Sequence, residues 1–227
     1  MINFLLAVLS LPGVFPGEAD CMEALLSAGL GRLHLRKPEA TAEELEVLVG
    51  RLAPRWAERL VLHGPDSREL ALRYGVPNVH GAVAYRDGSG YSGGGPAVDG
   101  GEAGRAMEVG RAPAGAKSDG GRFVLSTSAH GWEEFSRLPQ GLAYAFISPL
   151  FDSISKRGYR ANAGLLKRPG GELPCRPVGL GGVSGETIGQ MLDYGWKGAA
   201  VLGWIWEKPQ QAVNRLEELQ KIIADAT

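Results

Sequence analysis

Cysteine is scarce in this sequence of 227 residues, which contains only Cys21 and Cys175. The two lie far apart and outside any CxxC or Cys/His spacing, which argues against a disulfide framework and against a structural zinc site. An excess of charge of one sign is also lacking, because the formal net charge is −1 and both signs are mixed along the chain. Without a basic field, nucleic acid and acidic membrane surfaces are poor partners. We therefore expect a cytoplasmic protein with a small-molecule partner.

Long hydrophobic runs are missing as well, since none approaches the roughly 20 residues that a membrane-spanning helix needs. The N-terminal MINFLLAVLSLPG is the nearest to a secretion signal, but no Lys or Arg precedes its apolar run and no AxA-like site follows. We interpret residues 4–10 as a first buried strand, with a signal as the alternative. The 44% of hydrophobic residues can fill one large core, so we predict one domain over 1–227, with two small domains as the alternative.

Large apolar residues are almost absent from residues 86–121, which are crowded with Gly, Ser, Ala and Pro. Such a stretch buries too little to offset its ordering entropy, and we predict a mobile, Gly-rich insertion. A lid over a site is the functional interpretation, and an unconstrained surface insertion is the plain one.

Eight apolar runs of strand length recur along the rest of the chain. Amphipathic segments of helical length separate most of them, for example 41–52 with Thr41 as N-cap, 184–195 from Ser184, and 209–226. Parallel strands covered by helices give this pattern, and eight repeats predict an α/β fold, a single (β/α)8 TIM barrel with its Gly-rich insertion after strand four. The eight runs are NFLLAVLS, GRLHLRK, RLVLHG, NVHGAVA, RFVLSTS, LAYAFISP, RPVGLGGV and GAAVLGW.

Groups that can hold an anion follow the last three predicted strands. In this fold the loops after the strands form the active face, and phosphate commonly lies beside the loops after strands seven and eight. Gly181 and Gly182 let the backbone approach a ligand closely, and the helix predicted from Ser184 can aim free N–H groups at an anion, although a glycine pair also makes ordinary tight turns. The other predicted phosphate ligands are Ser153, Ser155, Lys156 and Gly203, for which ordinary loop polarity is the alternative.

All four histidines lie at or just past the ends of predicted strands. His34 and Arg36 share one side of their strand, and an inward Arg requires an anion or a structural salt bridge. Ser128 and His130 could serve where a proton is moved, with a role at a helix start as the alternative.

In this order, the motifs resemble those of the thiamine phosphate synthase and thiazole tautomerase family of (β/α)8 barrels. AYAFISPLFDSISKRGY resembles the family's DYVxxGPxFxTxTK; LHLRKP, STSAHGWEEF, PVGLGGV and GAAVLGWIW match its other segments in sequence order. The synthase joins an aminopyrimidine-methyl diphosphate to a thiazole phosphate and releases pyrophosphate. The resemblance implies these small phosphorylated substrates, with phosphate near Ser153, Ser155, Lys156 and Gly182, and Gly203 close by. It places His34, Arg36 and His63 by the pyrimidine diphosphate and Ser128 by the departing pyrophosphate. In a synthase, Arg36, Lys37 and Lys156 would neutralise the diphosphate, with Arg36 and Lys156 as catalytic residues.

The sequence departs from the synthase pattern at the magnesium-binding aspartates. His63 and Gly64 occupy the place of the family's Asn-Asp pair, and Tyr85 lies near the place of its second aspartate. Magnesium is therefore a possible cofactor, with Asp66 or Asp87 as candidate substitutes. A tautomerase, which needs no magnesium and in which His130 would move the proton, is the alternative function. A non-catalytic phosphate binder is the third, and a homo-oligomer stays open.

Overall fold

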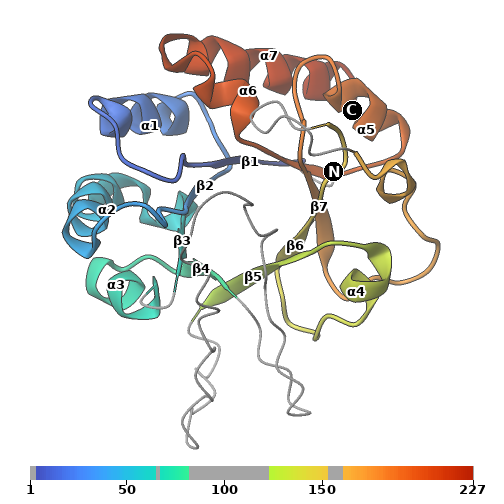
Figure 1. Cartoon of the computed structure of the whole chain (residues 1–227), viewed down its shortest axis with the longest axis horizontal. Coiled ribbons are helices and arrows are strands. Elements are labelled where there is room, and N and C mark those ends of the chain that lie inside the picture. Colours follow the sequence, from blue (N-terminus) through green and yellow to red (C-terminus); the bar gives the residue numbers. More distant parts are fainter. Residues whose placement is uncertain (1–3, 65–66, 82–122, 153–160, 227) are drawn as a thin grey trace, which may run out of the picture.

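Eight parallel strands form a closed barrel with helices around it in the computed structural model (Figure 1). The structure describes residues 4–64, 67–81, 123–152 and 161–226. Each strand pairs with the next in sequence, and β1 pairs with β8 to complete the ring. The predicted (β/α)8 TIM barrel is confirmed. Residues 86–121, the predicted insertion, belong to the connection between β4 and β5 and lie outside the described residues, and the assignment of all 227 residues to one domain stays a prediction.

Each of the eight apolar runs forms a strand, and only β5 extends beyond its run, by the one residue Ala129. The strands are β1 Leu5–Leu9, β2 Arg32–Leu35, β3 Leu60–His63, β4 Asn78–His80, β5 Val124–Ala129, β6 Tyr144–Ile147, β7 Arg176–Leu180 and β8 Gly198–Val201. The helices are α1 Glu18–Ser27, α2 Ala42–Trp56, α3 Ser67–Tyr74, α4 Trp132–Ser136, α5 Ile188–Asp193, α6 Gly203–Trp206 and α7 Ala212–Asp225, with short 3-10 turns at Ala57–Arg59, Ala163–Leu165 and Pro209–Gln211. Within the described ranges, none of these helices has the length and apolar character needed to cross a membrane.

Local hydrogen bonds decide where two predicted helices begin. Thr41 caps α2 in a capping box, because its hydroxyl accepts from the Glu44 N–H and the Glu44 carboxylate accepts from the Thr41 N–H. The helix predicted from Ser184 begins only at Ile188. The Ser184 N–H donates to Thr187 Oγ1 at 2.9 Å, so these two residues form a turn that competes with the helix.

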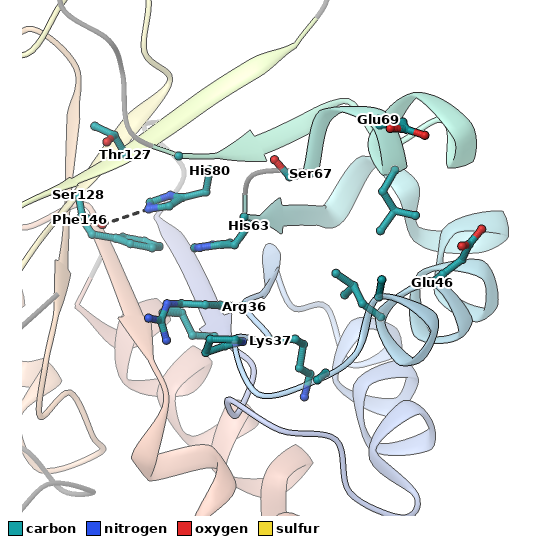
Figure 2. Close-up of a pocket in the computed structure, with 18 of the residues that line it drawn as sticks. Arg36, Lys37, Glu46, His63, Ser67, Glu69, His80, Thr127, Ser128 and Phe146 are labelled. Atoms are coloured by element: carbon teal, nitrogen blue, oxygen red, sulfur yellow. Dashed lines mark hydrogen bonds between the residues drawn. The ribbon is translucent and has the colours of Figure 1, made fainter. Parts of the chain in front are cut away.

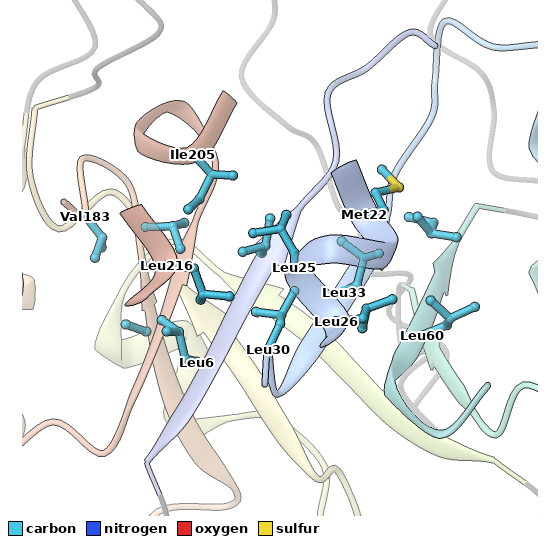
Figure 3. Close-up of a cluster of buried hydrophobic side chains, with 14 of the residues drawn as sticks. Leu6, Met22, Leu25, Leu26, Leu30, Leu33, Leu60, Val183, Ile205 and Leu216 are labelled. Atoms are coloured by element: carbon cyan, nitrogen blue, oxygen red, sulfur yellow. The ribbon is translucent and has the colours of Figure 1, made fainter. Parts of the chain in front are cut away.

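The core has two layers. Between the barrel and its helices, side chains such as Leu6, Leu25 and Leu33 pack in a continuous cluster (Figure 3). Inside the barrel a second, smaller cluster comes from β1 and β6–β8 and includes Phe146 and Val178. On β2–β5, by contrast, imidazole, hydroxyl and amide groups occupy buried positions, namely His34, Asn78, His80 and Ser126. The polar half of the barrel is therefore where a chemical site would lie.

Candidate active site at the mouth of the barrel

A cavity of about 880 Å³ opens at the carboxyl ends of the strands and extends outward between α2 and α3. Its inner wall includes Arg36, His63, His80, Ser128 and Phe146 (Figure 2). This volume lies within the range of about 300–1,000 Å³ that is typical of ligand pockets. The position matches the face on which TIM barrels carry their active sites.

Three imidazole rings form the centre of the polar half of the barrel. His34 Nδ1 lies 2.8 Å from His63 Nε2. His63 and His80, which are register partners on β3 and β4, stack with ring centroids 4.2 Å apart (Figure 2). His34 is fully buried beneath them and does not line the cavity, whereas His63 and His80 do.

Burial sets the charge state of these rings. Desolvation lowers the pKa of His34 and of His63 well below the usual imidazole range, and the neighbouring histidines act in the same direction. Desolvation, with a smaller contribution from the Arg36 cation, lowers the pKa of His80 to about 3. All three rings are therefore neutral near pH 7.

Hydroxyl groups contact ring nitrogens of His34 and His80. The Tyr144 hydroxyl lies 2.7 Å from His34 Nε2, and burial raises the pKa of this phenol to about 12, so it stays protonated. Ser126 Oγ lies 2.9 Å from His80 Nδ1, and Ser128 Oγ lies 3.1 Å from His80 Nε2 (Figure 2). These contacts fix the ring orientations and leave the cavity face to His63, His80 and Ser128.

Arg36 supplies the cation of the cavity. Its backbone is held by Ser10, whose hydroxyl accepts from the Arg36 N–H at 2.9 Å and donates to the Arg36 carbonyl at 3.0 Å. Within the described part of the chain, no ion pair or hydrogen bond engages the Arg36 guanidinium, which is exposed. The Arg36 backbone is therefore held in place, and its guanidinium is available to bind an anion that enters the cavity.

Lys37 differs from its neighbour because its ammonium is already paired. Lys37 Nζ is bonded to the Glu18 carboxylate and donates to the Gly13 carbonyl at 2.7 Å, in a pair whose side chains are 0% and 1% exposed. Its residue lines the cavity, but its charge is neutralised by Glu18. The predicted contact of Lys37 with substrate stays a prediction, and in the structure its ammonium forms a buried ion pair with Glu18.

His130 lines the cavity just beyond β5 and is exposed. Its backbone N–H donates to Glu134 Oε2 at 2.6 Å across the start of α4. Both interpretations from the sequence therefore have a physical basis, the helix start through the backbone and proton transfer through the side chain.

The two glycines after β7 leave space for the segment of chain that follows β6. Both glycines have positive φ, and a Cβ on Gly182 would lie 2.3 Å from the Asp152 carbonyl oxygen. The Phe151 N–H donates to the Gly181 carbonyl at 3.0 Å, so the chain after β6 packs directly on this turn. Of the predicted phosphate ligands, Ser153, Ser155 and Lys156 lie outside the described residues, and Gly181, Gly182 and Gly203 are not part of the cavity wall.

The carboxylates of the described cavity wall do not fit magnesium. They belong to Glu46 and Glu69 on α2 and α3, and both pair with Arg73, at 2.6 and 3.0 Å. Figure 2 shows them away from His63 and Arg36. Magnesium prefers free carboxylate oxygens, so this wall offers no such site. The candidate substitutes, Asp66 and Asp87, lie outside the described residues.

The sequence identifies His80 only as a strand-end residue and predicts no role for Ser126, Tyr144 or Phe146. The signal that could have found the cluster is the recurrence of histidine at the ends of three consecutive strands. In a parallel barrel such positions become neighbours, here His63 and His80 as direct register partners.

Comparisons with known proteins give the fold. No family model and no curated protein matches the sequence. A thiamine phosphate pyrophosphorylase from Bacteroides thetaiotaomicron is 23% identical, with a TM-score of 0.64 over 96% of this chain and 97% of that one. One from Pyrococcus furiosus is 16% identical, with a TM-score of 0.66 over 99% and 96%.

A tryptophan synthase subunit alpha from Legionella pneumophila is 11% identical to the chain, with a TM-score of 0.59 over 98% of this chain and 93% of that one. Enzymes with different activities thus share the architecture, and identities this low do not distinguish between their activities. The chain is a (β/α)8 barrel, and the solved structures of similar fold include thiamine phosphate pyrophosphorylases.

Proposed function

We propose that the protein is a transferase of the thiamine phosphate synthase type, which joins an aminopyrimidine-methyl diphosphate to a thiazole phosphate and releases pyrophosphate. The observation that carries this proposal is the Arg36 guanidinium, which lines the cavity and has no partner among the described residues. The collinear motifs and the two pyrophosphorylase structures of similar fold support it.

The reaction makes two physical demands on the site. Negative charge grows on the leaving diphosphate as its bond to the pyrimidine methylene breaks, and the thiazole nitrogen must be held in line with that carbon. Arg36 would neutralise the diphosphate, and the Ser128 hydroxyl, on the same wall, would donate to its oxygens. The Phe146 ring, which is buried beside His80 with centroids 5.1 Å apart, adds an apolar part to the same wall.

A thiazole tautomerase is the second candidate, and a specific observation favours it. The described cavity wall has no free carboxylates for magnesium, and His130 lines the cavity. In that enzyme His130 would remove and return a proton on a carboxythiazole phosphate. Arg36 would then have no diphosphate to neutralise.

Turnover assays separate the two candidates. The purified protein is incubated with both phosphorylated substrates and magnesium, and thiamine phosphate is measured. In parallel, solvent deuterium exchange into the carboxythiazole phosphate is followed. The proposal predicts thiamine phosphate in the first assay. Proton exchange without it would assign the tautomerase, and binding of thiazole phosphate without either reaction would leave a phosphate binder.

Variants test the role of Arg36. Arg36→Ala should lower the synthase kcat by about 10²–10³, the usual effect of removing one donor to a developing charge. The control is Arg55→Ala, since Arg55 is also exposed but stacks on Trp56 in α2, outside the cavity wall. A synthase unaffected by Arg36→Ala would contradict the assigned role.

A further inference from the structure

We propose that His34, His63 and His80 form a three-histidine site for a borderline divalent transition metal, with Zn²⁺ as the expected ion. One nitrogen of each ring lies within 4.8 Å of those of the other two, on three consecutive strands. The proposal does not rest on the activity proposed above, because metal binding can be measured without any substrate.

The donor set selects the class of metal. All three donors are imidazole nitrogens, and within the described ranges no carboxylate or thiol joins the cluster. Hard ions such as Mg²⁺ and Ca²⁺ require oxygen ligands, whereas imidazole suits Zn²⁺, Cu²⁺, Ni²⁺ and Co²⁺. Three protein ligands with an open position are the arrangement of reactive zinc sites rather than of structural ones. His63 and His80 line the cavity, so the open position would face it.

In His34 and His80, the ring nitrogen that would not bind the ion already has the kind of partner that metal-binding histidines usually have. With His34 Nδ1 on the ion, its Nε2–H would donate to the Tyr144 hydroxyl, 2.7 Å away. With His80 Nε2 on the ion, its Nδ1–H would donate to Ser126 Oγ, 2.9 Å away. Such outer contacts fix the tautomer and aim the lone pair inward. Burial supports this arrangement, because it keeps the rings neutral and their lone pairs available.

Metal binding requires small ring movements. Zinc–nitrogen bonds of about 2.0–2.1 Å in a tetrahedron place two donors about 3.3 Å apart. The 2.8 Å contact between His34 and His63 would open by about 0.5 Å, and the longest separation, at most 4.8 Å, would close by at most about 1.5 Å. His80 Nε2 would give up its contact with the Ser128 hydroxyl, which lies at the cavity surface.

Charge balance adds a further requirement. The Arg36 cation acts on His63 and His80, so a dication between those rings raises the local positive charge. An anionic oxygen at the open position would offset it. We therefore expect phosphate to tighten metal binding.

The fourth histidine provides a matched control. Untagged full-length protein is stripped with a chelator and titrated with Co²⁺, whose absorption bands report four-coordinate nitrogen ligation, and Zn²⁺ is then added to displace it. We expect one ion per chain in the wild type and in His130→Gln. His63→Gln and His80→Gln should each weaken binding by more than about a hundredfold, because even an outer-shell loss costs 10–100-fold.

Tyr144→Phe removes the hydroxyl that would hold the His34 ring and should weaken metal binding about 10–100-fold. Circular dichroism shows which variants are folded, and the wild-type titration decides the question if the histidine variants fail to fold. The proposal is overturned if the wild type binds neither ion at one per chain. It is also overturned if thiolate charge-transfer bands appear, or if folded His63→Gln and His80→Gln keep wild-type affinity.

Discussion

The buried ion pair between Lys37 and Glu18 should be strongly coupled to stability. Its side chains are 0% and 1% exposed, and one Glu18 oxygen has no hydrogen-bond partner among the described residues. Replacing Glu18 by Gln removes the negative charge that faces the buried Lys37 ammonium, and Lys37→Met leaves a buried carboxylate. Breaking one side of a buried pair costs about 3–5 kcal/mol, so each single variant should lose that much.

The double variant Glu18→Gln/Lys37→Met isolates the coupling. Replacing a buried pair by neutral groups of similar volume is often near neutral, so the double variant should be less destabilised than the sum of the singles by about 3 kcal/mol or more. Urea unfolding followed by circular dichroism measures all four proteins. Additive losses would refute the reasoning, because they would mean that the two charges are solvated independently.

The same double variant tests whether Lys37 contacts the ligand. Since the Lys37 ammonium is held by Glu18, we expect the double variant to bind inorganic pyrophosphate with wild-type affinity. A loss as large as that of Arg36→Ala would return Lys37 to the set of anion ligands.

Two further predictions concern backbone strain and thiol chemistry. Gly182→Ala should cost well over the roughly 1–2 kcal/mol of a left-handed residue, because its Cβ would meet the Asp152 carbonyl at 2.3 Å. Gly195→Ala, with a φ of +75° and no atom within 4 Å, should cost only that amount; equal urea midpoints for the two would contradict the clash. Burial raises the pKa of the half-buried Cys175 thiol to about 11. Alkylation of Cys175 at pH 8, followed by mass spectrometry, should therefore be at least about tenfold slower in the folded protein than after unfolding. Similar rates in the two states would show that the thiol is solvated.

The order of strands could be predicted from the sequence because each buried strand leaves a continuous apolar run between polar segments. The capped start of α2 followed from Thr41 and Glu44 in the same way. The start of α5 did not, because the turn of Ser184 and Thr187 depends on side-chain hydrogen bonds that resemble a cap in sequence.

The candidate site, too, could be predicted from the sequence only in part. Strand ends placed Arg36 and His63 at the active face, but only the packed structure separates the available Arg36 from the paired Lys37 beside it. A ligand contact of the glycines after β7 stays a prediction, whereas the residues that pack on them come from the chain after β6, about 30 positions away in sequence. Such pairings depend on three-dimensional proximity, which local sequence patterns do not encode.

The most direct test of the account is a crystal structure grown with thiazole phosphate and pyrophosphate. The account predicts pyrophosphate inside the cavity, with an oxygen within hydrogen-bonding distance of the Arg36 guanidinium and another near Ser128 Oγ. Anions bound only outside this cavity, or an Arg36 side chain turned away from an occupied one, would contradict it.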